Sequence, residues 1–77
     1  MEIRIEYCVQ WNYEPRARSL RQDLSDTFGY WAEITPGARG AFEVYINNNI
    51  AFSKLKEDRF PSDREVVEFI EGVLNVT

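Results

Sequence analysis

The chain has a single cysteine, Cys8, among its 77 residues. An intramolecular disulfide is therefore impossible, and the packing of apolar side chains must hold the fold together. At this length a folded chain buries only about 60% of the surface that its unfolded form exposes. We therefore expect one small domain over residues 1–77, with one compact core and no room for a second.

Histidine is absent, and this removes several classes of active site. A Ser-His-Asp or Cys-His triad cannot form, and a Cys/His zinc site has no ligands beyond one thiol, so we expect no metal. Acidic residues outnumber basic residues by 13 to 9. Since phosphate contacts need a surplus of Lys and Arg, we expect no nucleic-acid partner.

The first residues, Met1 to Glu6, alternate apolar and charged side chains. They contain no unbroken apolar run, so they are typical of neither a signal peptide nor a membrane span. We expect a cytoplasmic protein that binds no membrane and is a monomer or a weak homodimer.

The first half of the chain predicts a strand followed by a helix. Apolar residues at every second position predict the strand over residues 2–7, which ends at Cys8. Pro15 suits the first turn of a helix, and Gly29 suits its end. The pattern leaves open whether this helix begins at Trp11 or at Glu14. Its apolar face is formed by Ala17, Leu20, Leu24 and Phe28.

The second half predicts three more strands and a closing helix. The strands cover residues 30–35, 41–46 and 50–55, with a loop over residues 36–40 and a tight turn at Asn47–Asn49. Ser62 and Glu65 form a capping box before the last helix. That helix has an apolar face of Val66, Val67, Phe69, Ile70, Val73 and Leu74.

The order β-α-β-β-β-α favours one mixed sheet. The first two strands should be parallel through a right-handed crossover, and the Asn-rich hairpin should be antiparallel. With two helices covering four strands, this is an α/β (α+β) thioredoxin-like fold. It places Cys8 where a strand ends and a helix begins, a common position for sites in α/β proteins.

Five segments of the chain occur together in a characteristic order: Ile5–Tyr13, Arg16-Ala17, Pro36–Val44, Phe52-Ser53-Lys54 and Arg59-Phe60-Pro61. In these segments the chain resembles the selenoprotein W family, also called the Rdx family. The resemblance covers essentially the whole chain and implies a thioredoxin-like fold with thiol redox chemistry.

The family's signature is C-x-x-C or C-x-x-selenocysteine, so the resemblance implies that Cys8 is the first redox position and Trp11 the second. A dyad needs a nucleophilic thiol and a resolving thiol or selenol, and tryptophan cannot resolve a mixed disulfide. The remaining chemistry is a mixed disulfide of Cys8 with glutathione or a partner protein, or a sulfenic acid. No other cofactor is expected.

Each candidate residue has a functional and a structural interpretation. The amides of the helix start and Arg16 could lower the pKa of Cys8 and make its alkylation near pH 7 faster than that of free cysteine. Otherwise Cys8 is an inert buried thiol. Trp11 is either an exposed aromatic platform or a side chain folded over the end of the sheet.

The loop over residues 36–40 should lie beside the Cys8 loop, because parallel strands end at the same edge. Val9, Gln10 and Arg16 with Gly37 and Gly40 then form a candidate substrate loop, and Arg39 could aid anionic partners such as glutathione. The alternative is a plain connection that needs a flexible backbone.

The carboxylates predict no acid-base pair. Asp23 with Asp26 and Glu65 with Glu68 should face solvent, and Glu43 should point away from the core. Ser19 and Ser53 have no base partner.

Three functions follow. The first is a thiol redox protein of selenoprotein W type, and any oxidoreductase activity would be impaired by the loss at Trp11. The second is a non-catalytic protein-interaction module on a thioredoxin-like fold. The third is a degenerate domain without a retained role.

The codon for residue 11 tests the assignment of the second redox position. Selenocysteine is encoded by UGA, one base from the tryptophan codon UGG, so we expect that position 11 is a former selenocysteine. Sequencing the source gene checks this. A cysteine codon, or UGG in a lineage that never carries selenocysteine there, would contradict it.

Overall fold

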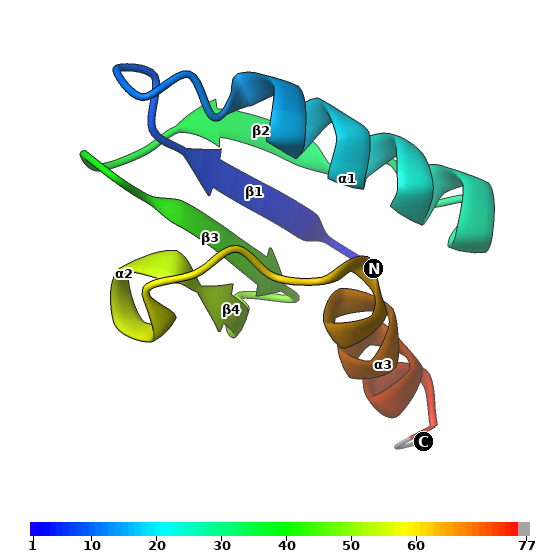
Figure 1. Cartoon of the computed structure of the whole chain (residues 1–77). Coiled ribbons are helices and arrows are strands. Elements are labelled where there is room, and N and C mark those ends of the chain that lie inside the picture. The colour runs from blue at the N-terminus through cyan, green and yellow to red at the C-terminus, as the bar shows by residue number, and fades with distance from the viewer. Residues whose placement is uncertain (76–77) are drawn as a thin grey trace.

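The computed structural model describes residues 1–75 as a four-stranded sheet with three helices (Figure 1). In chain order the elements are β1 (Ile3–Tyr7), α1 (Glu14–Phe28), β2 (Glu33–Pro36), β3 (Phe42–Ile46), β4 (Asn49–Ser53), α2 (Lys54–Glu57) and α3 (Asp63–Leu74). The predicted order is confirmed, with the short helix α2 as an addition.

The sheet has the order β2-β1-β3-β4. Strand β1 pairs in parallel with β2 and antiparallel with β3, and β3 pairs antiparallel with β4. The predicted mixed sheet is therefore confirmed. Because β1 is central, its carboxyl end is flanked by the end of β2 and the start of β3, and Figure 1 shows the loops after β1 and β2 at this same end.

The core lies between the sheet and the two long helices. Ile5 of β1 and Val44 of β3 are fully buried, as are Leu24 of α1 and Ile70 of α3. All four belong to one apolar cluster. Burial of each such side chain contributes about 1.5–3 kcal/mol, and no disulfide adds to it.

Helix α1 begins at Glu14, which settles the alternative that the sequence left open. Tyr13 is the N-cap and makes no side-chain capping bond, while Pro15 lies in the first turn. At the other end Gly29 has φ 77° and its N–H donates to the Ser25 carbonyl, as predicted for a glycine stop. A loop of five residues therefore separates Cys8 from the helix.

Strand β2 begins at Glu33, three residues later than the predicted 30–35. The aromatic side chains before it pack on α1 instead of pairing in the sheet. The Tyr30 ring stacks on Phe28 with centroids 6.0 Å apart, and the Arg21 guanidinium lies 4.3 Å from the centre of the Trp31 ring. Side-chain packing thus replaces the first part of the predicted strand.

The hairpin between β3 and β4 turns at Asn47 and Asn48, with φ of 50° and 67°. Two consecutive left-handed residues match the right-handed twist of the flanking strands, and asparagine tolerates this conformation. The predicted turn is confirmed.

The predicted strand over residues 50–55 is wrong at its end, since Lys54 and Leu55 begin α2. The cause is Glu43, which is buried and only 6% exposed. Its carboxylate accepts hydrogen bonds from the Ser53 hydroxyl and from the backbone N–H groups of Lys54, at 2.8 Å, and Leu55, at 3.4 Å. The expectation that Glu43 is a free outward charge is therefore wrong, because it caps a helix.

Helix α3 begins at the predicted capping box. The Ser62 side chain accepts from the Glu65 N–H, and the Glu65 carboxylate accepts from the Ser62 N–H at 2.9 Å. Arg59 also pairs with Glu65 through two bonds of 2.7 and 2.8 Å. The Arg59–Glu65 pair holds the segment before α3 in place, and Phe60 in this segment packs against Phe42 of β3.

The Glu43 cap predicts a stability loss in Glu43→Ala. The substitution leaves the N–H groups of Lys54 and Leu55 without their acceptor, so we expect the free energy of unfolding to fall by about 1–3 kcal/mol. Denaturant unfolding measures this, with the exposed Glu71→Ala as a control that should change little. Equal stability of the two variants would contradict the capping role.

Candidate functional site

Cys8 lies directly after β1 and is 1% exposed. Its N–H donates to the Ala41 carbonyl at 2.9 Å, which extends the β1–β3 pairing by one residue. Its carbonyl accepts from the Tyr13 N–H at 3.1 Å, and the Asn12 N–H donates to Val9 at 3.0 Å. With Asn12 at φ 59°, the chain folds into a tight loop around the sulfur.

Several groups act on the pKa of the Cys8 thiol. Burial raises it, but hydrogen bonds from the backbone amides of Gly40, Trp11 and Gln10 lower it, and the charge of Arg39 lowers it further. The net result is a pKa below the ordinary value. The site therefore favours the thiolate, the form that attacks disulfides.

The source of this effect differs from the sequence-based expectation. We expected the start of the helix and Arg16 to stabilise the thiolate, but α1 begins only at Glu14. The Arg16 guanidinium instead lies over Phe60, with Cζ 3.9 Å from the ring centre. The lowered pKa thus comes from loop amides and from Arg39.

The loop between β2 and β3 packs against the Cys8 loop. The Gly37 N–H donates to the Tyr7 carbonyl at 2.8 Å, and a Cβ at Gly37 would lie 3.0 Å from the Glu6 Cβ. Gly40 has φ 78°, and a Cβ there would lie 3.0 Å from the Trp11 ring. Close backbone approach therefore requires glycine at both positions.

Trp11 combines the two alternatives that the sequence left open. Its ring lies over Gly40 and meets Tyr13 edge to face at 6.1 Å between centroids. The side chain is nevertheless 49% exposed, and the neighbouring Val9 is 59% exposed, while Gln10 is exposed too. An aromatic and aliphatic surface thus surrounds the buried thiol.

An aromatic cluster that the sequence did not predict lies beside this loop and is formed by Trp11, Tyr13, Phe42 and Phe60. The Phe60 centroid lies 4.7 Å from that of Tyr13 and 5.4 Å from that of Phe42. The Lys54 Nζ lies 5.3 Å from the Phe60 ring and 5.4 Å from the Tyr13 ring. No local spacing indicates the cluster, because its members come from three separate segments of the chain.

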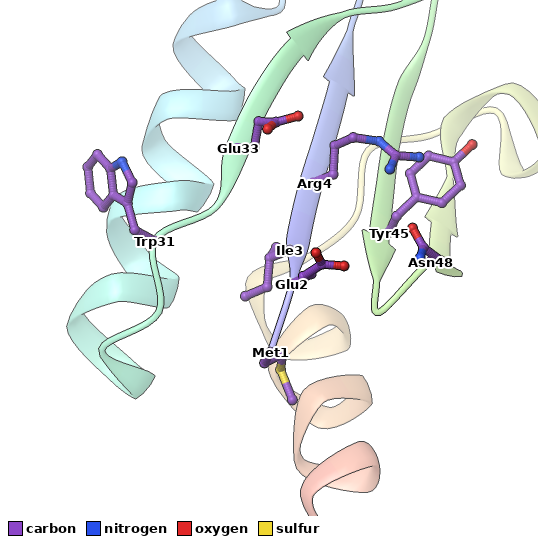
Figure 2. Close-up of a pocket in the computed structure, with 8 residues that line it drawn as sticks. All are labelled: Met1, Glu2, Ile3, Arg4, Trp31, Glu33, Tyr45 and Asn48. Carbon is purple, nitrogen blue, oxygen red and sulfur yellow. The ribbon is translucent and has the colours of Figure 1, made fainter.

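A hollow of about 480 Å³ lies at the amino end of β1, away from Cys8 (Figure 2). In it Arg4 projects toward Tyr45, with Cζ 4.3 Å from the ring centre, and also pairs with Glu6. It holds no thiol, so it has no part in chemistry at Cys8. Its lining residues are Met1, Glu2, Ile3, Arg4, Trp31, Glu33, Tyr45 and Asn48.

Residues 1–75 form neither a cluster of metal ligands nor a membrane-spanning helix. They contain no group of three or more His, Cys, Asp or Glu side chains placed to hold a metal ion. None of the helices formed by these residues has the length and apolar character needed to cross a membrane.

Comparisons with known proteins agree with the fold. The sequence model of the Rdx family matches residues 2–72. The crystal structure of a selenoprotein W-related protein from Vibrio cholerae superposes with a TM-score of 0.89 at 26% identity, covering 96% of each chain. A protein from Bordetella parapertussis gives 0.86 at 26% identity, with 92% of this chain and 94% of that one covered.

Curated relatives give the same picture. Migration and invasion enhancer 1 of Bos taurus is 32% identical over 76 residues, 97% of this chain. The chain spans 66% of the length of that relative. A SelT-like protein of Arabidopsis thaliana is 51% identical over 35 residues, which are 46% of this chain and 17% of that protein.

The arrangement around the sulfur predicts the ionisation of Cys8. We expect the thiol to titrate below the ordinary pKa of cysteine, and Arg39→Gln to raise the midpoint because it removes a favourable charge. Ultraviolet thiolate absorbance across pH measures the midpoint independently of access to the buried sulfur. Alkylation rates over the same range then test the expected fast reaction near pH 7.

Two variants serve as controls for this titration. Cys8→Ser should show no thiolate signal, and Arg18→Gln, which changes the same net charge at an exposed pair with Glu14, should leave the midpoint in place. A parent midpoint at or above that of free cysteine would contradict the role of the loop amides.

Proposed function

Because the chain belongs to the Rdx family, we propose that it is a thiol redox protein with Cys8 as its nucleophile. The observation that carries this proposal is the position of Cys8 at the end of β1, where its N–H donates to Ala41 and the amides of Gly40, Trp11 and Gln10 lower the pKa of its thiol. This chain has no histidine, and oriented backbone amides can stabilise a thiolate without one.

The proposed step is thiol–disulfide exchange. The Cys8 thiolate attacks one sulfur of a disulfide in glutathione or a partner protein, the S–S bond breaks, and the other sulfur leaves as a thiolate that takes up a proton. Cys8 then holds a mixed disulfide. Since no second thiol is present in the chain, an external thiol must release it.

Residue 11 is the proposed second redox position. Its backbone amide is one of the groups that lower the pKa of Cys8, so a thiol or selenol at this position would lie near that sulfur. Tryptophan supplies no resolving group. The proposal that position 11 is a former selenocysteine position rests on the C-x-x-C or C-x-x-selenocysteine signature of the family.

The surrounding residues have proposed roles in substrate contact. Val9 and Gln10 are exposed next to the thiol, where a substrate can contact them. Gly37 and Gly40 let the loop between β2 and β3 pack closely against the Cys8 loop. Arg39 stabilises the thiolate. Arg16 lies at the edge of the aromatic cluster, over the Phe60 ring.

We also propose that the protein acts in the cytoplasm.

A second candidate function is a non-catalytic interaction module. The observation that favours it is the exposure of Val9 and Trp11 around a thiol that is itself 1% exposed. Exposed aromatic side chains concentrate binding energy in protein interfaces. Partner binding that survives Cys8→Ser, without any disulfide chemistry, would favour this module.

Trp11→Cys tests the redox proposal. We expect the parent to form a mixed disulfide once per chain, and Trp11→Cys to gain turnover in thiol-dependent reduction of a disulfide because the new thiol resolves the intermediate. A coupled assay of disulfide reduction measures the rate per chain.

Trp11→Ser is the matched control, since it removes the indole without adding a thiol, and it should show no turnover. The double variant Cys8→Ser/Trp11→Cys should also be inactive. Failure of the parent to form a mixed disulfide and of Trp11→Cys to turn over would refute the redox proposal.

A further inference from the structure

The basic residues of this acidic protein are unevenly neutralised. Four of the nine, Arg4, Arg18, Arg59 and Arg64, pair with carboxylates at 3.2 Å or less. Within residues 1–75 the other five have no carboxylate oxygen within 4.0 Å, and they are Arg16, Arg21, Arg39, Lys54 and Lys56. Although acidic residues outnumber basic ones in the chain, these five cations therefore form no ion pair with a carboxylate.

Three of these cations gather around the aromatic cluster, and we call them the basic rim: Arg16, Arg39 and Lys54. The Arg39 Cζ and the Lys54 Nζ both lie within 6.0 Å of the Trp11 ring centre. Arg16 lies over Phe60. Cation–π contacts hold these side chains in place but leave their positive charge available to an anion.

No carboxylate of residues 1–75 forms an ion pair with the rim within 4.0 Å. Glu43 is engaged by Ser53 and the amides at the start of α2, and Glu14 pairs with Arg18. Hydrogen bonding with the Asp23 carboxyl, with burial and the charge of Asp23, raises the pKa of Asp63 to about 6. These acids have partners other than the rim.

The rim encloses exposed apolar surface, and this indicates the size of the ligand. Val9 and Trp11 lie beside Cys8, and Leu55, next to Lys54, is 57% exposed. A small anion would meet one or two cations and leave this surface uncovered. A chain with spaced carboxylates and apolar side chains between them matches both features.

We propose that this face docks an acidic polypeptide segment and delivers its disulfide to Cys8. The inference deepens the proposed function and rests on it for the chemical step. The partner's acidic side chains contact the basic rim, and its apolar side chains cover Val9, Trp11 and Leu55. The Cys8 thiolate then attacks one sulfur of the segment's disulfide, and the other sulfur leaves as a thiolate that takes up a proton.

Three peptides of equal length test the docking. Each carries one cysteine as a mixed disulfide with 2-nitro-5-thiobenzoate, flanked by acidic, neutral or basic residues, and release of the coloured thiolate gives the rate constant. At low salt we expect the acidic peptide to react about tenfold faster than the basic one, with the neutral peptide between them. The difference should shrink at high salt because ions screen the rim.

Substitutions assign the preference to the rim. Lys54→Gln should reduce the acidic-to-neutral rate ratio by several fold, and Lys54→Arg should retain it. Arg64→Gln, at an exposed position of α3, changes the net charge equally and should keep the ratio. Lys54 is preferred to Arg39 here because Arg39 also acts on the pKa of Cys8.

A binding arm separates docking from chemistry. Calorimetry of Cys8→Ser with a cysteine-free acidic peptide should show salt-sensitive binding that Lys54→Gln weakens. If no disulfide reacts with the parent, the proposed function fails while this arm still decides the docking.

Four results would overturn the docking inference. The first is equal rates for the three peptides, and the second is a loss of the preference in Arg64→Gln as large as in Lys54→Gln. The third is a reaction of glutathione disulfide as fast as that of the acidic peptide. The fourth is tighter binding of a single-stranded oligonucleotide than of the acidic peptide. The last two would assign the rim to a small anion or to nucleic acid.

Discussion

The hydrogen bonds of the central strand β1 organise the site. Tyr7 accepts from Gly37 on one side, and Cys8 donates to Ala41 on the other. These two bonds join the loop after β1 to both ends of the loop between β2 and β3. The amides of Gly40 and of residues 10 and 11 then all lower the pKa of one thiol, so the electrostatics of Cys8 depend on the strand order.

Much of the fold follows from local sequence patterns. Alternation predicted β1, the proline and glycine positions bounded α1, and the asparagines set the β3–β4 turn, because each depends on residues close together in the chain. The errors occur where long-range contacts decide. Glu43 ends β4 early by accepting from the Lys54 N–H at the start of α2, eleven residues away in sequence, and Trp31 lies outside β2 against Arg21. No local pattern contains these pairs.

The candidate site divides in the same way. Cys8 and the glycines were predicted because a strand end, a parallel neighbour and a tight loop have recognisable residues. The sequence pattern attributes the stabilisation of the thiolate to Arg16 and the start of the helix. In the structure it comes from loop amides and Arg39 instead. Lys54 was noted only within a resembling segment. Its position over Tyr13 and Phe60 depends on where Glu43 makes the chain turn into α2.

Because Trp11 contacts Gly40, the residues that can be tolerated at positions 11 and 40 depend on each other. While an indole covers residue 40, any side chain there meets the ring at 3.0 Å, and the positive φ adds a cost of about 1–2 kcal/mol for a residue other than glycine. The effects of changes at the two positions therefore cannot add independently. A bulky residue 11 therefore restricts position 40 to glycine by steric contact as well as by backbone conformation, and a small residue 11 would leave only the conformational cost.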